Sequence, residues 1–294
     1  MEPFLFPMKT ILLLIGTFSS LICSAFILEQ ELWINNGVSN VVDSPEIPYT
    51  AFNPTSDFET LNAIMTIQVG DTIAFTIHNN DTLSHGFNIK NVSIEGGPFV
   101  ILPGDFLEVE VGFDDYGAFI YYDDLNYPHY KSLGAAGTIV VSNTVHPIFY
   151  WNMKEHDKGW NQDITEGVFS PSEDYDPLYF TINGLSNPDT QDDPISRITG
   201  NVGDTLVICI TNTGQMVHSI HFHGYHAKVT YSSQSASHVD REKDTFAMFP
   251  METVLIYIVP HQPGEYPVHD HNLVATSGNG IYANGMFHII EIFE

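Results

Sequence analysis

The stretch Val69-Gly70-Asp71-Thr72-Ile73 organises the whole sequence, because it returns in the second half as Val202-Gly203-Asp204-Thr205-Leu206. The same offset, carried forward without gaps, places Asn79 on Asn212. It also aligns two His-containing segments, and both copies close on a glycine followed by an apolar run. Self-similarity at a constant offset indicates repeated structural units. The chain is therefore predicted to hold two related domains.

Each copy has the local pattern of an all-β protein. Short runs rich in Val, Ile, Phe, Tyr and Thr are separated by clusters of Gly, Pro, Asn and Asp. No long stretch has the helical period, so the pattern predicts a pair of β-sandwiches. Trp151 and Trp160 lie between the copies and suggest that the intervening segment packs on the domains. The predicted ranges are 27–143 for domain 1, 144–175 for the connector and 176–294 for domain 2.

The composition excludes several classes of protein. The 294 residues include 36 acidic and 9 basic side chains, which gives a formal net charge of −27. This balance argues against nucleic-acid binding, which needs a basic surface. Apolar residues make up 43% and charged residues only 15%, so the chain is predicted to fold. Fourteen His stand against two Cys, which directs attention to metal chemistry.

The first segment, residues 1–25, has the pattern of a secretory signal peptide. Lys9 precedes an apolar run, and the run ends at the small residues Ser24 and Ala25. The run is short for a membrane span, so a secreted or periplasmic protein is expected. Ile22 before Cys23 disfavours a lipoprotein anchor. The remaining cysteine, Cys209, lies in an apolar run and is expected in the core.

Two histidine pairs carry the strongest chemical signal. His221 and His223 are two residues apart, and so are His269 and His271. Side chains alternate along a strand, so each pair points to one face. On neighbouring strands the four imidazoles would converge on one site, and neutral imidazole suits copper, zinc, iron and nickel. The pattern predicts a metal site in domain 2, with a hydrogen-bonded structural cluster as the alternative.

The segment His218-Ser219-Ile220-His221-Phe222-His223-Gly224 resembles the H-x-x-H-x-H-G motif of multicopper oxidases. His269-Asp270-His271 resembles their later H-C-H motif, and Asn284-Gly285-Met286 resembles the end of that segment. The resemblance implies two Greek-key cupredoxin domains, as in two-domain laccases and copper nitrite reductases. It also implies copper as the cofactor. In that family the first His of the motif binds type 1 copper, and the others bind a trinuclear type 2/type 3 centre.

The chain departs from this family at the type 1 position. A blue copper site needs a Cys thiolate, and Asp123 and Asp270 stand at that place in the two domains. Ile281 replaces the second His of the site in domain 2. A blue copper centre is therefore not expected. Asp270 can join His218 and Met286 around a metal, although hydrogen bonding to a nearby group is the favoured role.

The trinuclear positions are filled in domain 2 alone. At the matching places domain 1 carries Asn88, Lys90, Tyr122 and Asp124, while His85 matches a type 1 position. Only half of the family's site is therefore predicted, and in a homotrimer it would face domain 1 of a neighbour. The metal candidates are His221, His223, His269 and His271, with His218, Asp270, Met286 and His226 as weaker ones.

Two classes of function remain open at this point. The first is an exported copper oxidoreductase in which oxygen or a small-molecule substrate reaches the histidine site directly. The second is a non-enzymatic protein that binds copper, or zinc, for structure or storage. An open coordination position would favour the first class, and a closed tetrahedron would favour the second.

Overall fold

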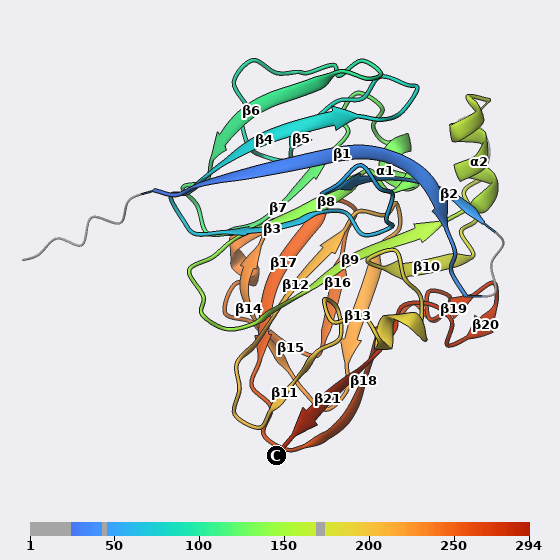
Figure 1. The fold of residues 1–294 in the computed structure, drawn as a ribbon. Coiled ribbons are helices and arrows are strands. Elements are labelled where there is room, and N and C mark those ends of the chain that lie inside the picture. The colour runs from blue at the N-terminus through green and yellow to red at the C-terminus, as the bar shows by residue number, and fades with distance from the viewer. Residues whose placement is uncertain (1–24, 43–45, 169–173) are drawn as a thin grey trace, which may run out of the picture.

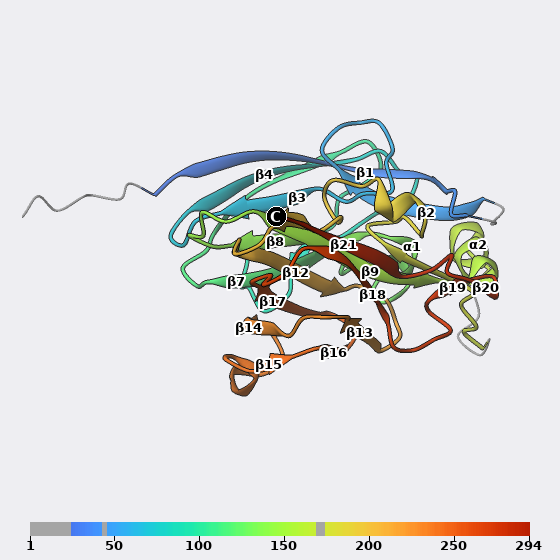
Figure 2. The ribbon, with the colours of Figure 1, turned by 90° about the horizontal axis from the view of Figure 1, so that it is seen from below.

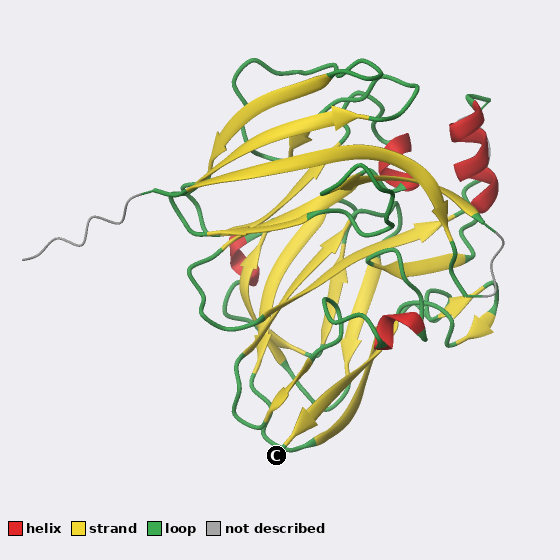
Figure 3. Ribbon diagram, viewed as in Figure 1, coloured by secondary structure: helices red, strands yellow, loops and turns green. Residues whose placement is uncertain are grey.

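A computed structural model describes residues 25–42, 46–168 and 174–294. The predicted signal peptide lies outside the described residues apart from Ala25. Two β-sandwiches are stacked on each other, with domain 1 in blue and green and domain 2 in orange and red (Figure 1). Strands dominate and the helices are few and short (Figure 3). The predicted all-β fold with two cupredoxin-like domains is confirmed.

Domain 1 is formed by two four-stranded sheets, ordered β2-β1-β4-β6 and β3-β8-β7-β5. β4 shows why its sequence folds this way, because Ile73, Phe75 and Ile77 alternate with half-buried side chains and face the core. The strands are β1 (Ile27–Ser39), β2 (Ile47–Asn53), β3 (Ile64–Ile67), β4 (Thr72–Asn79), β5 (Asn88–Ile89), β6 (Phe106–Gly112), β7 (Gly117–Tyr122) and β8 (Ala136–Val141).

The main sheets of domain 2 have six and five strands, ordered β10-β9-β12-β17-β14-β15 and β11-β21-β18-β13-β16. β12 is apolar on both faces because both are covered. One face lies in the core of domain 2, and the other packs on domain 1, where Cys209 contacts Ala118 and Val140. The core position predicted for Cys209 is confirmed. The first strands are β9 (Ile148–His156), β10 (Tyr179–Ile182), β11 (Thr199–Asn201), β12 (Leu206–Asn212), β13 (His218–Phe222) and β14 (Ala227–Ser232). The remaining strands are β15 (Glu242–Lys243), β16 (Thr245–Met248), β17 (Glu252–Ile258), β18 (Gly264–Asp270) and β21 (Phe287–Phe293).

Short elements occupy the connections. A hairpin of β19 (Ser277–Gly278) and β20 (Ile281–Tyr282) lies at the same end of the molecule as α2, as Figures 1 and 2 show. Among the described residues, no helix has the length and apolar character needed to cross a membrane. The helices are α1 (His129–Leu133) and α2 (Lys158–Glu166), with single 3-10 turns at Asp189–Gln191 and Ala236–His238.

The sequence repeat is also a structural repeat. Gly70 and Gly203 begin equivalent tight turns with positive φ angles of 93° and 88°, which glycine adopts without steric cost. Asn79 and Asn212 each donate to two loop carbonyls from a buried amide. The parallel pairing of β1 with β4 returns as the pairing of β9 with β12. The two sandwiches therefore share strand pairing, turns and buried polar anchors.

β9 lies inside the range 144–175 that the sequence analysis assigns to the connector. It is the counterpart of β1 and a full strand of the six-stranded sheet. Trp151 is 1% exposed in the core of domain 2, and its indole donates to the Ser196 carbonyl at 2.6 Å. The connector range thus contributes a strand and core to domain 2, and the exact domain limits stay a prediction.

Candidate metal centre

Four histidines gather on the outer face of β13 and β18. The two strands are antiparallel neighbours, and His221 lies directly opposite His269. Ile220 and Phe222 alternate with the histidines and are buried, so the imidazoles point away from the core. The closest ring centroids, of His221 and His223, are 4.8 Å apart, and those of His221 and His271 are 5.6 Å apart. The structure therefore brings together all four histidines that the sequence singled out.

The hydrogen-bond network assigns which nitrogen of two of these rings carries no hydrogen. His269 Nδ1 donates to the Asp270 carbonyl at 2.9 Å, which leaves its Nε2 as a lone pair. Thr245 donates its hydroxyl hydrogen to Asp244 at 3.1 Å, so its oxygen accepts from His221 Nδ1 at 2.9 Å. His221 Nε2 is then also a lone pair. Both rings hold the tautomer that binds a metal through Nε2.

The spacing of the ring nitrogens suits a shared ion. His223 Nε2 donates to His269 Nε2 at 3.0 Å, and an ion that bound both nitrogens would replace this hydrogen. Two nitrogens that bind one ion at about 2.0–2.1 Å lie roughly 2.9–3.3 Å apart for angles near 90–109° at the ion. Within the described residues, no set of three or more His, Cys, Asp or Glu side chains is already closed around one point. Rotation of exposed imidazoles is therefore needed to complete a site.

His218 sits behind this cluster in a buried triad of charged groups. Its Nδ1 donates to Asp270 at 2.6 Å and its Nε2 donates to Glu155 at 2.9 Å. All three side chains are fully buried. Burial would lower the pKa of His218, but the hydrogen bonds to Asp270 and Glu155 raise it to about 9. His218 is thus an imidazolium with neither ring nitrogen free for a metal.

The other weaker metal candidates are Asp270, Met286 and His226. Asp270 uses its second oxygen to accept the backbone N–H groups of Ser219 and Asn272. The hydrogen-bonding role favoured for Asp270 is therefore confirmed. Met286 is fully buried in the apolar core of domain 2. His226 is exposed beyond the end of β13.

Domain 1 contains the same triad without the histidine cluster. His85 Nδ1 contacts Asp123 at 2.8 Å, and His85 Nε2 contacts Asp81 at 2.8 Å. Gly86 N–H donates to Asp123 just as Ser219 N–H donates to Asp270. Burial would lower the pKa of His85, but the bonds to Asp123 and Asp81 raise it. Both domains therefore fill the type 1 position with an ionic triad.

The register confirms which residues of domain 1 match the cluster. Asn88 lies opposite Tyr122 on β5 and β7, as His221 lies opposite His269. The Asn88 amide donates to Asp124 at 3.3 Å, and Lys90 donates to the Met251 carbonyl at 2.5 Å. Asn88 and Asp124 thus bond to each other within domain 1, and Lys90 bonds to domain 2. Domain 1 thus has no imidazoles at the equivalent positions.

Sequence reasoning missed the third member of each triad. Glu155 lies in the range assigned to the connector, and 63 positions separate it from His218. Asp81 lies four residues before His85, a spacing that carries no distinctive signal by itself. No motif could have found Glu155, because its position depends on the pairing of β9 with β12.

Comparisons with known proteins agree with this geometry. The multicopper oxidase family matches residues 159–285, and no curated protein sequence matches the chain. A blue copper oxidase from Nitrosomonas europaea superposes with a TM-score of 0.77 at 20% identity, covering 90% of this chain and 86% of that one. The multicopper oxidase mgLAC gives 0.76 at 21% identity, with coverage of 90% and 86%. A copper nitrite reductase from Nitrosomonas europaea gives 0.70 at 15% identity, with coverage of 91% and 94%.

Proposed function

We propose, from the premise that this chain belongs to the cupredoxin-like family of multicopper oxidases and copper nitrite reductases, that it is an exported copper-binding oxidoreductase. The copper ligands would be His221, His223, His269 and His271. One observation carries the proposal, namely the convergence of four imidazoles at two paired strands, where the Nδ1 bonds of His221 and His269 leave Nε2 of each ring without a hydrogen.

The donor set fits copper. Imidazole nitrogen is a ligand that copper prefers, and the strand pairing holds two of the rings opposite each other. His223 and His271 are exposed, so a small molecule can reach the site from solvent. Copper bound there would supply one-electron redox chemistry to oxygen or a small substrate. The protein would contribute the ligand tautomers through Thr245 and the Asp270 carbonyl.

The proposed centre works without a blue copper relay. The type 1 positions hold His218 and His85, each with both ring nitrogens bonded to buried carboxylates. Cys209 is buried in an apolar cluster, and burial raises the pKa of its thiol to about 12. The part of the chain that the structure describes therefore offers no thiolate to either position. We expect substrates to react at the histidine site instead of passing electrons from a distant surface.

A homotrimer is part of this proposal. The histidine cluster lies on an outer sheet face, and the loop that follows β18 exposes Leu273 and Val274 beside it. A neighbouring copy would cover these apolar side chains and help to enclose the site. Sedimentation of the metal-loaded full chain tests this arrangement, which a monomer at micromolar concentration would contradict.

One observation favours a second function, which is metal binding without catalysis. The four imidazoles can close into a complete shell around copper or zinc once the exposed rings rotate. Metal analysis with electron paramagnetic resonance on the purified protein separates the two functions. A copper signal that changes when azide is added indicates an open position and supports the oxidoreductase. A zinc-loaded protein, or copper that no small ligand reaches, supports the second function.

A further inference from the structure

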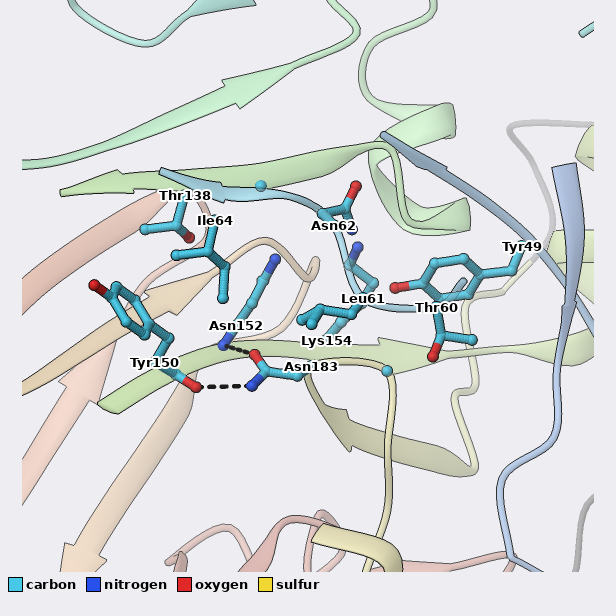
Figure 4. A pocket seen from close by; sticks show the side chains of 12 residues that line it. Tyr49, Thr60, Leu61, Asn62, Ile64, Thr138, Tyr150, Asn152, Lys154 and Asn183 are labelled. Atoms are coloured by element: carbon cyan, nitrogen blue, oxygen red, sulfur yellow. Dashed lines mark hydrogen bonds between the residues drawn. The ribbon is translucent and has the colours of Figure 1, made fainter. Parts of the chain in front are cut away.

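A small, largely enclosed cavity lies between the two domains, away from the histidine cluster. Figure 4 shows its walls, with Tyr49, Leu61 and Asn62 from domain 1 and Asn152 and Lys154 from domain 2. It has about 10 Å³ of room for the centre of a water-sized sphere. Because the centre of the sphere can move through this volume, the space holds one water molecule or one monoatomic ion and excludes larger molecules.

Lys154 supplies an unsatisfied positive group at this cavity. The residue is 2% exposed, and its Nζ has no hydrogen-bond partner among the described residues. Its nearest aromatic contact is the Tyr49 ring, whose centroid is 5.4 Å from Nζ. The chain has only nine Lys and Arg against 36 acidic residues, so burial of an unpaired lysine is unexpected. A buried ammonium without a counterion is costly.

The amide side chains of the walls are already engaged in hydrogen bonds. Asn62 donates to the Gly134 carbonyl at 2.9 Å, and Asn152 donates to the Ala136 carbonyl at 3.0 Å. Asn183 donates to the Tyr150 carbonyl at 2.8 Å. These amides cannot turn toward Lys154 without losing existing bonds. The hydroxyl of Tyr49 points toward the cavity in Figure 4, beside Lys154.

The charged groups around Lys154 do not neutralise it. Lys131 repels it and donates its own Nζ to the Gly214 carbonyl at 2.5 Å. Glu155 attracts it, but that carboxylate already accepts from His218 and from the Gln215 and Met216 N–H groups. Burial, followed by repulsion from Lys154, lowers the pKa of His156 to about 3, so this ring is neutral. While Lys154 is protonated, its positive charge therefore has no counterion among the described residues.

We infer that the cavity is a binding site for one monoatomic anion, such as chloride, held by the Lys154 ammonium and the Tyr49 hydroxyl. The ligand must be negative because the lysine is positive and unpaired. It must be small because the volume of the cavity is small. A water molecule would fit but would leave the ammonium without a counterion. An anion would neutralise it and tie β9 to the domain 1 segments that carry Tyr49 and Asn62.

The site is coupled to protonation of the lysine. Burial lowers the pKa of Lys154 to about 7, and repulsion by Lys131 adds to this effect against attraction by Glu155. Anion binding is therefore expected to tighten as the pH falls below about 7, where Lys154 is charged. The acidic surface repels anions elsewhere, so competing weak sites are few.

The test measures the melting temperature of the metal-free full chain while chloride replaces gluconate at constant ionic strength. Gluconate is too large for the cavity. A saturable rise of about 3 °C is expected for the wild type, because a ligand that binds the native state stabilises it. Lys154→Met should abolish this rise, and Lys228→Met, at an exposed lysine paired with Asp240, should keep it.

Two results would overturn the inference. One is an equal melting temperature of the wild type in chloride and gluconate, which is what a bound water predicts. The other is a chloride response that survives in Lys154→Met. If that variant does not fold, a wild-type crystal soaked in bromide decides. An anomalous peak beside Lys154 Nζ supports the anion site, and its absence refutes it.

Discussion

The two domains share turns, buried anchors and triads, and they differ in the chemistry of one patch of side chains. Both keep the Gly turn, the buried Asn anchor and the acid–His–acid triad. At the four positions outside the triad, domain 2 has imidazoles and domain 1 has Asn, Lys, Tyr and Asp. The triads occupy equivalent places and are buried in both domains, so their shared role is structural. The divergent patch is where domain 2 has a chemistry of its own.

The strongest test removes a histidine from the patch. His269→Ala should abolish copper binding, with an affinity loss on the order of 100-fold or more, because a direct ligand costs at least as much as its supporting groups. The matched control is Tyr122→Ala, which changes the equivalent position of domain 1. Isothermal titration with copper measures both variants. Full copper loading of a chain lacking all four histidines would show that the metal binds elsewhere.

The second test breaks the two triads in parallel. Asp123→Asn and Asp270→Asn should each lower the free energy of unfolding by about 3–5 kcal/mol, because a buried charge loses its partner. Only Asp270→Asn should also weaken copper binding, since Asp270 lies between His269 and His271. Urea unfolding and copper titration measure the two effects. Losses below about 1 kcal/mol in both variants would mean that the triads are not structural.

The third test concerns the tautomer of a single ring. Thr245→Val removes the hydroxyl that accepts from His221 Nδ1, and copper affinity should fall about 10–100-fold. Thr245→Ser keeps the hydroxyl and should retain most of the affinity. Nitrogen NMR of the metal-free protein reports the tautomer directly. An unchanged His221 spectrum in Thr245→Val would remove Thr245 from the site.

The smallest expected effect is the pH dependence of the domain 1 triad. The raised pKa of His85 stabilises the folded state. This contribution is complete below pH 6.5, the usual pKa of histidine, and it is lost as the pH rises through the pKa of His85 in the folded protein. The pKa of Asp81 is lowered from 3.8 to about 2, because hydrogen bonds, first of all with His85, outweigh burial. That contribution exists above pH 3.8 and is lost as pH falls through 2.

The corresponding measurement compares urea unfolding of the metal-free wild type and His85→Leu across the pH range. The difference in stability should be largest between pH 3.8 and 6.5 and should shrink on either side. The domain 2 triad is present in both proteins and cancels. A difference that does not vary with pH would show that His85 acts by packing alone.

Much of the fold and of the candidate site could be predicted from sequence. Strand alternation put His221 and His223 on one face, and the sequence left open that the second pair lies on a neighbouring strand, which the pairing of His221 with His269 shows. The loss of both thiolates was readable because Asp123 and Asp270 stand at identifiable motif positions. The pairing of β9 could not be predicted from the sequence, because its partner β12 begins 50 residues after β9 ends. Local patterns carry no information about such distant pairing.

The sequence by itself determined a two-domain all-β protein with four imidazoles on one side and no thiolate for blue copper. These features depend on side-chain alternation and on motifs a few residues long. Only the tertiary structure decided that Glu155 completes the His218 triad and that Lys154 is buried without a partner. Both outcomes follow from the pairing of β9 with β12, which carries charged residues from outside the motifs into buried positions near the boundary between the domains. There, desolvation makes each charge depend on neighbours that are distant in sequence.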